Sequence, residues 1–87
     1  MYEQQIRKII SQHATLAVGL ETLSDDSDLY AAGLSSLSTV NVMLALEDHF
    51  DIEFKDSMLG RKTFGTIRSL SETIEQLVGE QPSRASG

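Results

Sequence analysis

The stretch DLYAAGLSSLSTVNVMLALEDHFDIEF, residues 28–54, decides the fold. Its second half is apolar at helical spacing, and a turn containing Gly33 comes before two adjacent serines, Ser35 and Ser36. Serine is a preferred N-cap residue, because its hydroxyl accepts a hydrogen bond from a free backbone N–H in the first turn of a helix. The pattern therefore predicts a central packing helix from about Ser36 to Phe50.

Two further helices are predicted on either side of this central helix. Apolar residues at three- and four-residue steps predict a helix from about Glu3 to Val18. A similar pattern predicts a last helix from Thr66, its N-cap, to about Val78. The segment before it is predicted to be a loop with one short turn around Ser57 to Gly60. These elements make an all-α fold, a small four-helix bundle with three longer helices, one short helix and a long first loop.

The length and composition indicate one small domain. The 87 residues suffice for a single modest core, which we assign to residues 1–79. Residues 80–87 are small and polar and contain the only proline, so they are predicted to form a disordered tail. No apolar run approaches the length of a membrane span, and there is no cysteine. We expect a monomeric cytoplasmic protein that binds no membrane.

The charge of the chain is acidic and unevenly placed. There are 13 acidic and 7 basic residues, a net charge of -6, which argues against binding of nucleic acid. The segment from Asp25 to Phe54 contains seven acidic residues and no lysine or arginine. A segment of one sign can steer a basic partner toward it, although a merely solvated surface explains the same pattern.

The two serines do not suit nucleophilic catalysis. A serine hydrolase needs a base near the nucleophile and usually the sequence G-x-S-x-G, whereas this chain has G-L-S-S-L. His49 lies thirteen residues beyond Ser36 on the same predicted helix and cannot reach back to it. His13 falls near the apolar face of the first helix and is predicted to be a partly buried packing residue.

A metal site is not expected either. The EF-hand pattern needs glycine and glutamate at its sixth and twelfth positions, and counting from Asp26 these are Ala31 and Leu37. What remains is a chemically passive serine at a helix N-terminus, where the helix dipole and free N–H groups favour a phosphodiester that another enzyme installs. A helix cap with no further role is the alternative.

The quoted stretch resembles the acyl carrier proteins. Their pattern is an acidic-hydrophobic turn, then G-x-D-S-L, then an apolar helix that ends in an acidic cluster before a phenylalanine. Gly33, Ser36 and Leu37 match this pattern, and Ser35 stands where the family usually has aspartate. The resemblance implies that Ser36 bears 4'-phosphopantetheine, donated by coenzyme A through a phosphopantetheinyl transferase. It also implies that the chain catalyses nothing itself, because the thiol of the cofactor holds the cargo as a thioester.

The stretches DLYAAGLSS and FDIEFKDSMLGRKTFGTI are similar to stand-alone bacterial aminoacyl carrier proteins. This narrower resemblance implies that the cargo is an activated amino acid. It also implies two partners, a seryl-tRNA synthetase-like amino acid:carrier protein ligase for loading and a downstream acceptor enzyme. Two alternatives stay open: an acyl or peptidyl carrier for fatty-acid or secondary-metabolite synthesis, and an unmodified acidic protein-interaction module.

The partners are expected to dock around the second helix and the short helix. Ser38 and Asn41 stand where fatty-acid carriers tend to have acids, so the early part of this surface is less negative than is usual in the family. The residues expected to contact partners are Leu37, Val42, Glu47, Asp48, Met58, Arg61 and Lys62.

Overall fold

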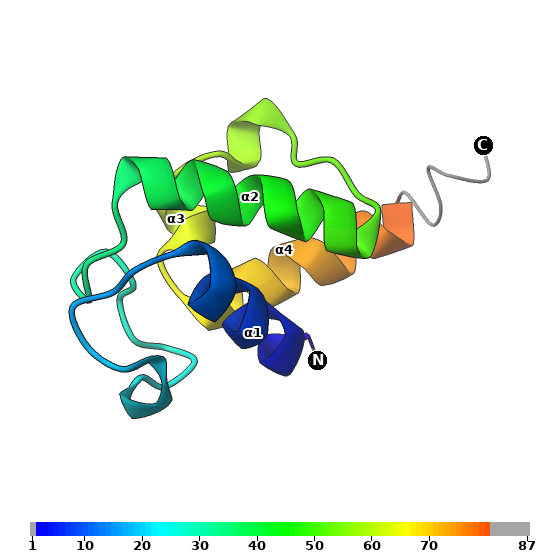
Figure 1. Ribbon diagram of the computed structural model, residues 1–87. Helices are drawn as coiled ribbons and strands as arrows, with labels where there is room; N and C mark the ends of the chain where they lie inside the picture. The colour runs from blue at the N-terminus through cyan, green and yellow to red at the C-terminus, as the bar shows by residue number, and fades with distance from the viewer. Residues whose placement is uncertain (1, 81–87) are drawn as a thin grey trace.

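The computed structural model describes residues 2–80 as a bundle of helices (Figure 1). In chain order its elements are α1 (Glu3–His13), the 3-10 turn η1 (Leu20–Thr22), α2 (Ser36–Phe50), the 3-10 turn η2 (Asp56–Met58), α3 (Arg61–Phe64) and α4 (Ile67–Glu80). No strand occurs within these residues, so the predicted all-α fold with a long first loop is confirmed. None of the described helices has both the length and the apolar character needed to cross a membrane.

One core holds the bundle together. Helix α1 contacts both α2 and α4, and α3 contacts α4. Each longer helix contributes the buried side of its apolar pattern, and the loops contribute apolar anchors between them. The buried core residues are Ile6, Ile9, Ile10, Leu29, Leu34, Val42, Leu46, Ile52, Phe54, Phe64, Ile67, Leu70, Ile74 and Leu77.

The first helix is shorter than the sequence predicts. It ends at His13, and Ala14 is already extended, with φ −137° and ψ 149°. The chain leaves the helix here and runs beside the turn before α2, where the backbone N–H of Ala17 donates to the carbonyl of Ala32 at 2.8 Å. This long-range hydrogen bond replaces the helical continuation to Val18. His13, expected to be a partly buried packing residue, is exposed at the helix end.

The short turn and the last helix are close to the prediction. The single turn expected around Ser57 to Gly60 is in fact two elements, η2 and α3. Thr66 is the cap of α4, because its Oγ1 accepts from the backbone N–H of Ser69 at 3.0 Å while Ser69 Oγ accepts from the N–H of Thr66 at 3.3 Å. Helix α4 includes Glu80, the first residue of the predicted tail, and residues 81–87 lie outside the described residues.

Two ion pairs fix the long first loop, and we call their four residues the arginine clasp: Arg7, Asp25, Asp26 and Arg68. Arg7 binds the carboxylate of Asp25 at 2.8 Å, and Arg68 binds that of Asp26 at 2.5 and 3.1 Å. The backbone N–H of Arg68 also donates to the carbonyl of Asp25 at 2.9 Å. The loop is thus tied to both α1 and α4.

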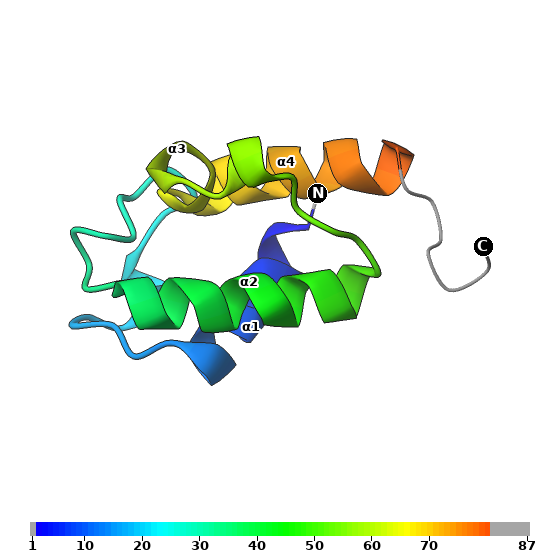
Figure 2. The ribbon, with the colours of Figure 1, turned by 90° about the horizontal axis from the view of Figure 1, so that it is seen from above.

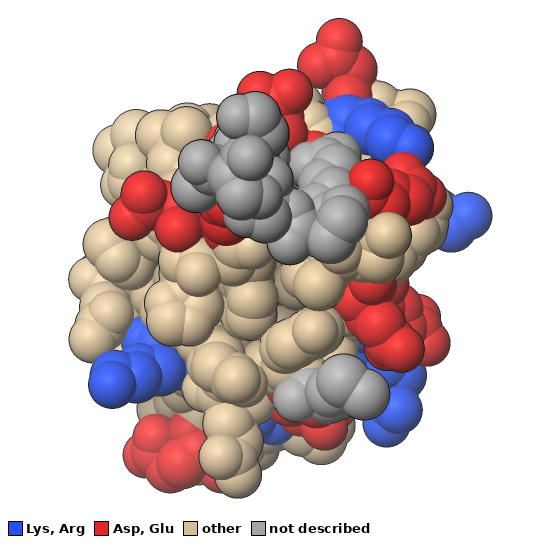
Figure 3. Space-filling view, turned by 90° about the vertical axis from the view of Figure 1, so that its right-hand side faces the viewer, with Lys and Arg blue, Asp and Glu red and all other residues tan. Residues whose placement is uncertain are grey.

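The start of α2 and the end of α4 lie at opposite ends of the bundle, as both ribbon views show (Figures 1 and 2). The α4 end faces the viewer in Figure 3, where acidic and basic side chains lie beside one another around the edge. At the end of α4, Lys55 forms an ion pair with Glu80 at 2.7 Å. Ser36 therefore lies at the end of the molecule remote from Glu80.

Candidate functional site

The two serines at the start of α2 have different environments. Ser35 is the N-cap, with extended backbone (φ −87°, ψ 167°), and its Oγ accepts from the backbone N–H of Ser38 at 3.1 Å. Ser36 is the first residue of the helix and is exposed. Its hydroxyl has no hydrogen-bond partner among residues 2–80. Ser35 is therefore occupied in capping, whereas the Ser36 hydroxyl is open to an incoming reagent.

The turn before the serines is held in place by Gly33. This residue has φ 111°, a conformation that L-residues other than glycine rarely adopt. A Cβ at Gly33 would also lie 2.9 Å from the backbone nitrogen of Ala17. Buried Leu29 and Leu34 anchor the turn on both sides of the glycine, and the N–H of Leu34 donates to the carbonyl of Leu29 at 3.0 Å. These contacts fix the position from which α2 starts.

The surroundings of Ser36 fit a serine-linked phosphodiester. The first turn of α2 contains no acidic residue that would repel a phosphate, and residues 36–46 contain no charged residue at all. The N-terminus of a fifteen-residue helix offers free backbone N–H groups and the positive end of the helix dipole. The Ser36 hydroxyl is exposed at this helix end, where a phosphate group would be accommodated.

His49 is not placed to act as a base for Ser36. His49 lies on the same helix as Ser36, thirteen residues further on, which is about 20 Å at 1.5 Å per residue. Its ring packs edge-on against Phe50, with ring centroids 4.8 Å apart. Among residues 2–80 no group of three or more histidine, cysteine, aspartate or glutamate side chains could hold a metal ion.

Comparison with known protein families identifies the family of this chain. A family model described as "Phosphopantetheine attachment site" matches residues 4–74. The chain belongs to the phosphopantetheine-binding carrier proteins. Phosphopantetheine is accordingly the cofactor of this carrier protein, as the resemblance implied.

Curated relatives of this carrier protein include two that are named for amino acids. The aminoacyl carrier protein of Agrobacterium fabrum is 42% identical over 73 residues, which cover 84% of this chain and 88% of the relative. The D-alanyl carrier protein of Streptococcus mutans is 36% identical over 78 residues, which cover 86% and 92% of the two chains.

Solved structures confirm the carrier-protein fold. One is the crystal structure of an engineered Bradyrhizobium japonicum glycine:[carrier protein] ligase complexed with carrier protein from Agrobacterium tumefaciens and AMP. The match has a TM-score of 0.80 at 42% identity and covers 84% of this chain and 97% of the other. Another is the solution structure of a holo acyl carrier protein from Nitrosomonas europaea, with a TM-score of 0.80 at 30% identity, covering 91% and 98%.

Most of the residues expected to contact partners lie at the surface of this carrier protein. Leu37 is 72% exposed. Glu47 has a structural role as well, because its Oε2 accepts from the backbone N–H of Phe54 at 2.8 Å and so closes the turn after α2. The other surface residues of this set are Asp48, Met58, Arg61 and Lys62, of which Met58 is half-buried.

The expectation for Val42 is wrong. This side chain is 1% exposed and belongs to the core, so it cannot contact a partner. Leu37, Val40 and Leu44 are the exposed apolar residues of α2, and they lie on its other side. The apolar residues of α2 extend beyond one face of the helix, so periodicity alone cannot separate the core side from the surface side.

Sequence reasoning also missed a hollow beside α2. It has a volume of about 190 Å³. Its lining includes Val40 and Leu59, whose side chains are 47% and 45% exposed. The guanidinium of Arg61 lies 4.8 Å from the centroid of the Tyr30 ring, which forms part of the wall. The signal in the sequence was the uncharged run 36–46, which is unusual for the surface of an acidic protein. The lining residues are Tyr30, Thr39, Val40, Met43, Leu59, Gly60 and Phe64.

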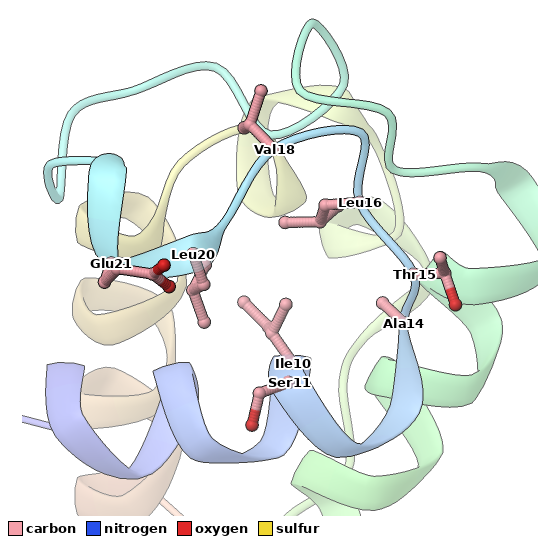
Figure 4. A pocket seen from close by; sticks show the side chains of 8 residues that line it. All are labelled: Ile10, Ser11, Ala14, Thr15, Leu16, Val18, Leu20 and Glu21. Atoms are coloured by element: carbon pink, nitrogen blue, oxygen red, sulfur yellow. The ribbon is translucent and has the colours of Figure 1, made fainter.

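A second hollow, of about 320 Å³, lies between the end of α1 and the first loop (Figure 4). Its wall combines apolar side chains such as Leu16 and Val18 with the carboxylate of Glu21. Thr39, Val40 and Met43 of α2 line the first hollow, and no residue of α2 lines the second. The second hollow is therefore separate from α2, the helix that begins at Ser36.

Proposed function

We propose that this carrier protein bears 4'-phosphopantetheine on Ser36 and holds an activated amino acid as a thioester. The assignment to Ser36 rests on the different environments of the two serines: Ser35 caps the helix, and the Ser36 hydroxyl is exposed. A phosphopantetheinyl transferase would supply the group from coenzyme A. The group would contribute the thiol that binds the cargo, while the chain presents it and does no catalysis of its own.

The names of the relatives support an amino acid as the cargo. The Agrobacterium and Streptococcus proteins described above are named for aminoacyl and D-alanyl groups. The matched complex contains a glycine:[carrier protein] ligase. We therefore propose a ligase of this kind as the loading partner, followed by an enzyme that accepts the amino acid, both in the cytoplasm.

The test is the intact mass of the protein after two incubations. The first, with coenzyme A and a phosphopantetheinyl transferase, should add the mass of one phosphopantetheine. The second, with ATP, glycine or alanine and the Bradyrhizobium ligase, should add one aminoacyl group. Ser36→Ala should abolish both additions, and Ser35→Ala should leave both intact. Modification of Ser36→Ala would overturn the site assignment, and failure of the parent chain to gain mass would favour the unmodified interaction module.

The cargo is tested separately from the site. If the holo protein resists aminoacylation but accepts a fatty acyl group from an acyl-activating enzyme, the aminoacyl assignment is wrong. The acyl carrier alternative would then replace it, with Ser36 unchanged as the attachment residue.

A further inference from the structure

We propose that the second hollow, between α1 and the first loop, binds a small organic amine. The ammonium group lies at Glu21, and the carbon skeleton packs against Leu16 and Val18. Binding does not depend on phosphopantetheine, because neither Ser36 nor any other residue of α2 lines this hollow. The turn before α2 responds to the bound amine.

The second hollow has the size and the walls of a small-molecule site. Its volume of about 320 Å³ lies within the range of about 300–1,000 Å³ that is usual for ligand pockets. Ile10, Leu16 and Leu20 are buried or half-buried, and their side chains converge on the hollow (Figure 4). Val18 is 47% exposed. An apolar skeleton placed here would remove the exposed part of Val18 from water, which favours binding.

The charge of the second hollow selects a cation. Glu21 is the only charged residue among the described residues that line it, and its carboxylate is turned toward the interior (Figure 4). This carboxylate has no ion pair among residues 2–80. The Ser11 hydroxyl is already engaged, because it donates to the carbonyl of Lys8 at 2.7 Å. A carboxylate beside an apolar wall is complementary to a cation that has an apolar body.

The nearby basic residues do not neutralise Glu21. Arg7 is held by the carboxylate of Asp25 at 2.8 Å and by the carbonyl of Leu20 at 3.2 Å. Lys8 lines an adjoining hollow of about 310 Å³, to which Glu21 also belongs, and it has no ion pair among residues 2–80. A lysine at this distance repels an amine but would attract the carboxylate of a zwitterionic amino acid. Lys8 therefore distinguishes the two kinds of ligand.

The wall of the second hollow is joined to the turn before α2. Ala17 lies between Leu16 and Val18, and its backbone N–H donates to the carbonyl of Ala32 at 2.8 Å. The contact is close, since a Cβ at Gly33 would lie 2.9 Å from the same nitrogen. A ligand that shifts Leu16 or Val18 therefore shifts the residue that holds the turn.

The experiment is an NMR titration of the backbone amides of the apo chain with phenethylamine, which is a cation at pH 7. We expect saturable shifts at Leu16, Val18 and Glu21 and a Kd on the order of 1 mM, because the ligand is small. Phenethyl alcohol, which has the same skeleton without the charge, should bind about fivefold more weakly. Absence of saturable shifts, or shifts confined to the hollow beside α2, would overturn the proposal.

Two matched pairs of variants test the charge and the apolar wall. Glu21→Gln should raise Kd about fivefold, less so at high salt, whereas Glu75→Gln, at an exposed position of α4, should change it less than about twofold. Val18→Ala should raise Kd about threefold. Val40→Ala should not, because Val40 is equally exposed but lines the other hollow. With thermal melts showing folded variants, equal Kd values within either pair would overturn the proposal.

Lys8→Gln decides between an amine and a zwitterion. It should lower the Kd of phenethylamine or leave it unchanged, because it removes a like charge. Phenylalanine, which adds a carboxylate to the same skeleton, should bind the wild-type chain more weakly than phenethylamine. If phenylalanine binds more tightly and Lys8→Gln abolishes the gain, the site takes a zwitterion and the assignment to an amine is wrong.

The response of the turn is measured in the same titration. The amides of Ala17 and Gly33 should shift with the same Kd as those of the wall, while that of Gly60 should not. Shifts at the wall without any at Ala17 and Gly33 would reject this part of the proposal. The mass gain expected at Ser36 is measured without the amine, so failure of the titration and failure of the proposed function are distinguishable.

Discussion

Between Ser35 and Ser36 the backbone changes from an extended to a helical conformation. The two hydroxyl groups therefore have different hydrogen-bonding environments. The Ser35 hydroxyl accepts from the N–H of Ser38 and satisfies one of the free donors of the first turn. The family usually has aspartate at this position, and serine and aspartate are N-caps of similar strength. A serine here therefore leaves no carboxylate beside Ser36 and keeps the cap.

Ser35→Ala should therefore lower the stability more than Ser36→Ala does, whereas only Ser36→Ala should prevent modification. Ser35→Ala should lower the free energy of unfolding by about 1 kcal/mol, because a capping hydrogen bond is lost. Ser36→Ala should change it by less than about 0.5 kcal/mol, as is usual at exposed positions without such contacts. Urea unfolding of the apo proteins measures both values, and equal losses would contradict the capping role of Ser35.

Gly33→Ala tests the close approach of the first loop to the turn before α2. Alanine at φ 111° is strained, and its Cβ would lie 2.9 Å from the nitrogen of Ala17, so we expect a loss of about 1–3 kcal/mol. Gly60→Ala is the control, because Gly60 has φ −146° and a Cβ there meets nothing within 4 Å. That variant should lose less than about 1 kcal/mol, because Gly60 is the N-cap of α3, where alanine is only somewhat less favourable than glycine. Similar unfolding curves for both variants would show that the turn can relax.

At the scale of the element, α2 ends where Asp51 adopts the left-handed conformation, with φ 55° and ψ 50°. The N–H groups of Asp51 and Ile52 both donate to the carbonyl of Glu47, which closes the helix. The end of the helix is thus set by one residue in a conformation that most side chains disfavour.

The cost of this conformation can be measured by comparing two variants with each other. Asp51→Gly and Asp51→Ala both remove the carboxylate, but only alanine suffers the steric penalty of left-handed backbone, about 1–2 kcal/mol. We expect the glycine variant to be the more stable by about 1 kcal/mol in urea unfolding. If alanine is equal or better, the helix end does not keep the left-handed conformation.

The arginine clasp gives the first loop a dependence on pH. The two hydrogen bonds from Arg68 lower the pKa of the Asp26 carboxyl below its ordinary value. A carboxyl whose pKa is lower in the folded state stabilises that state above its unfolded pKa of about 3.9. This contribution is lost as the pH falls through the lower folded value.

Asp26→Asn should therefore be less stable than the wild-type chain at pH 7, by a small amount because the pair is exposed. The difference should shrink as the pH falls below about 4. Urea unfolding at a series of pH values measures it, with Glu75→Gln, an exposed carboxylate on the same helix, as a control for charge on α4. A difference that stays constant down to acid pH would have a cause other than the ionised carboxylate.

At the scale of the whole molecule, helix bounds that depend on neighbouring residues could be predicted from the sequence. Features that depend on contacts between residues far apart in the chain could not. The bounds of α2 follow from the Ser35 cap and the apolar run, and Thr66 caps α4 as expected. The end of α1 depends instead on the hydrogen bond from Ala17 to Ala32. The pair of Asp26 with Arg68 joins residues 42 positions apart, and no local pattern indicates it.

In the candidate site, too, some features could be predicted from the sequence and others could not. The motif around Ser36 is local, so its place at the start of a helix could be predicted, and its modification stays a prediction. The partner surface could not be predicted residue by residue, because the uncharged run of α2 is apolar on both its buried and its exposed side. The pattern therefore places Val42 wrongly at the surface and does not single out Val40 and Leu44.

The opposite placement of Ser36 and the end of α4 has a consequence for immobilisation. A chain attached to a solid support through the α4 end would present Ser36 toward the solution in every molecule. A transferase or ligase could then reach the serine without steric hindrance from the support. Attachment through the turn at Gly33 would instead block this access. The geometry of the bundle thus defines which end of the carrier can be anchored while Ser36 stays accessible at the other.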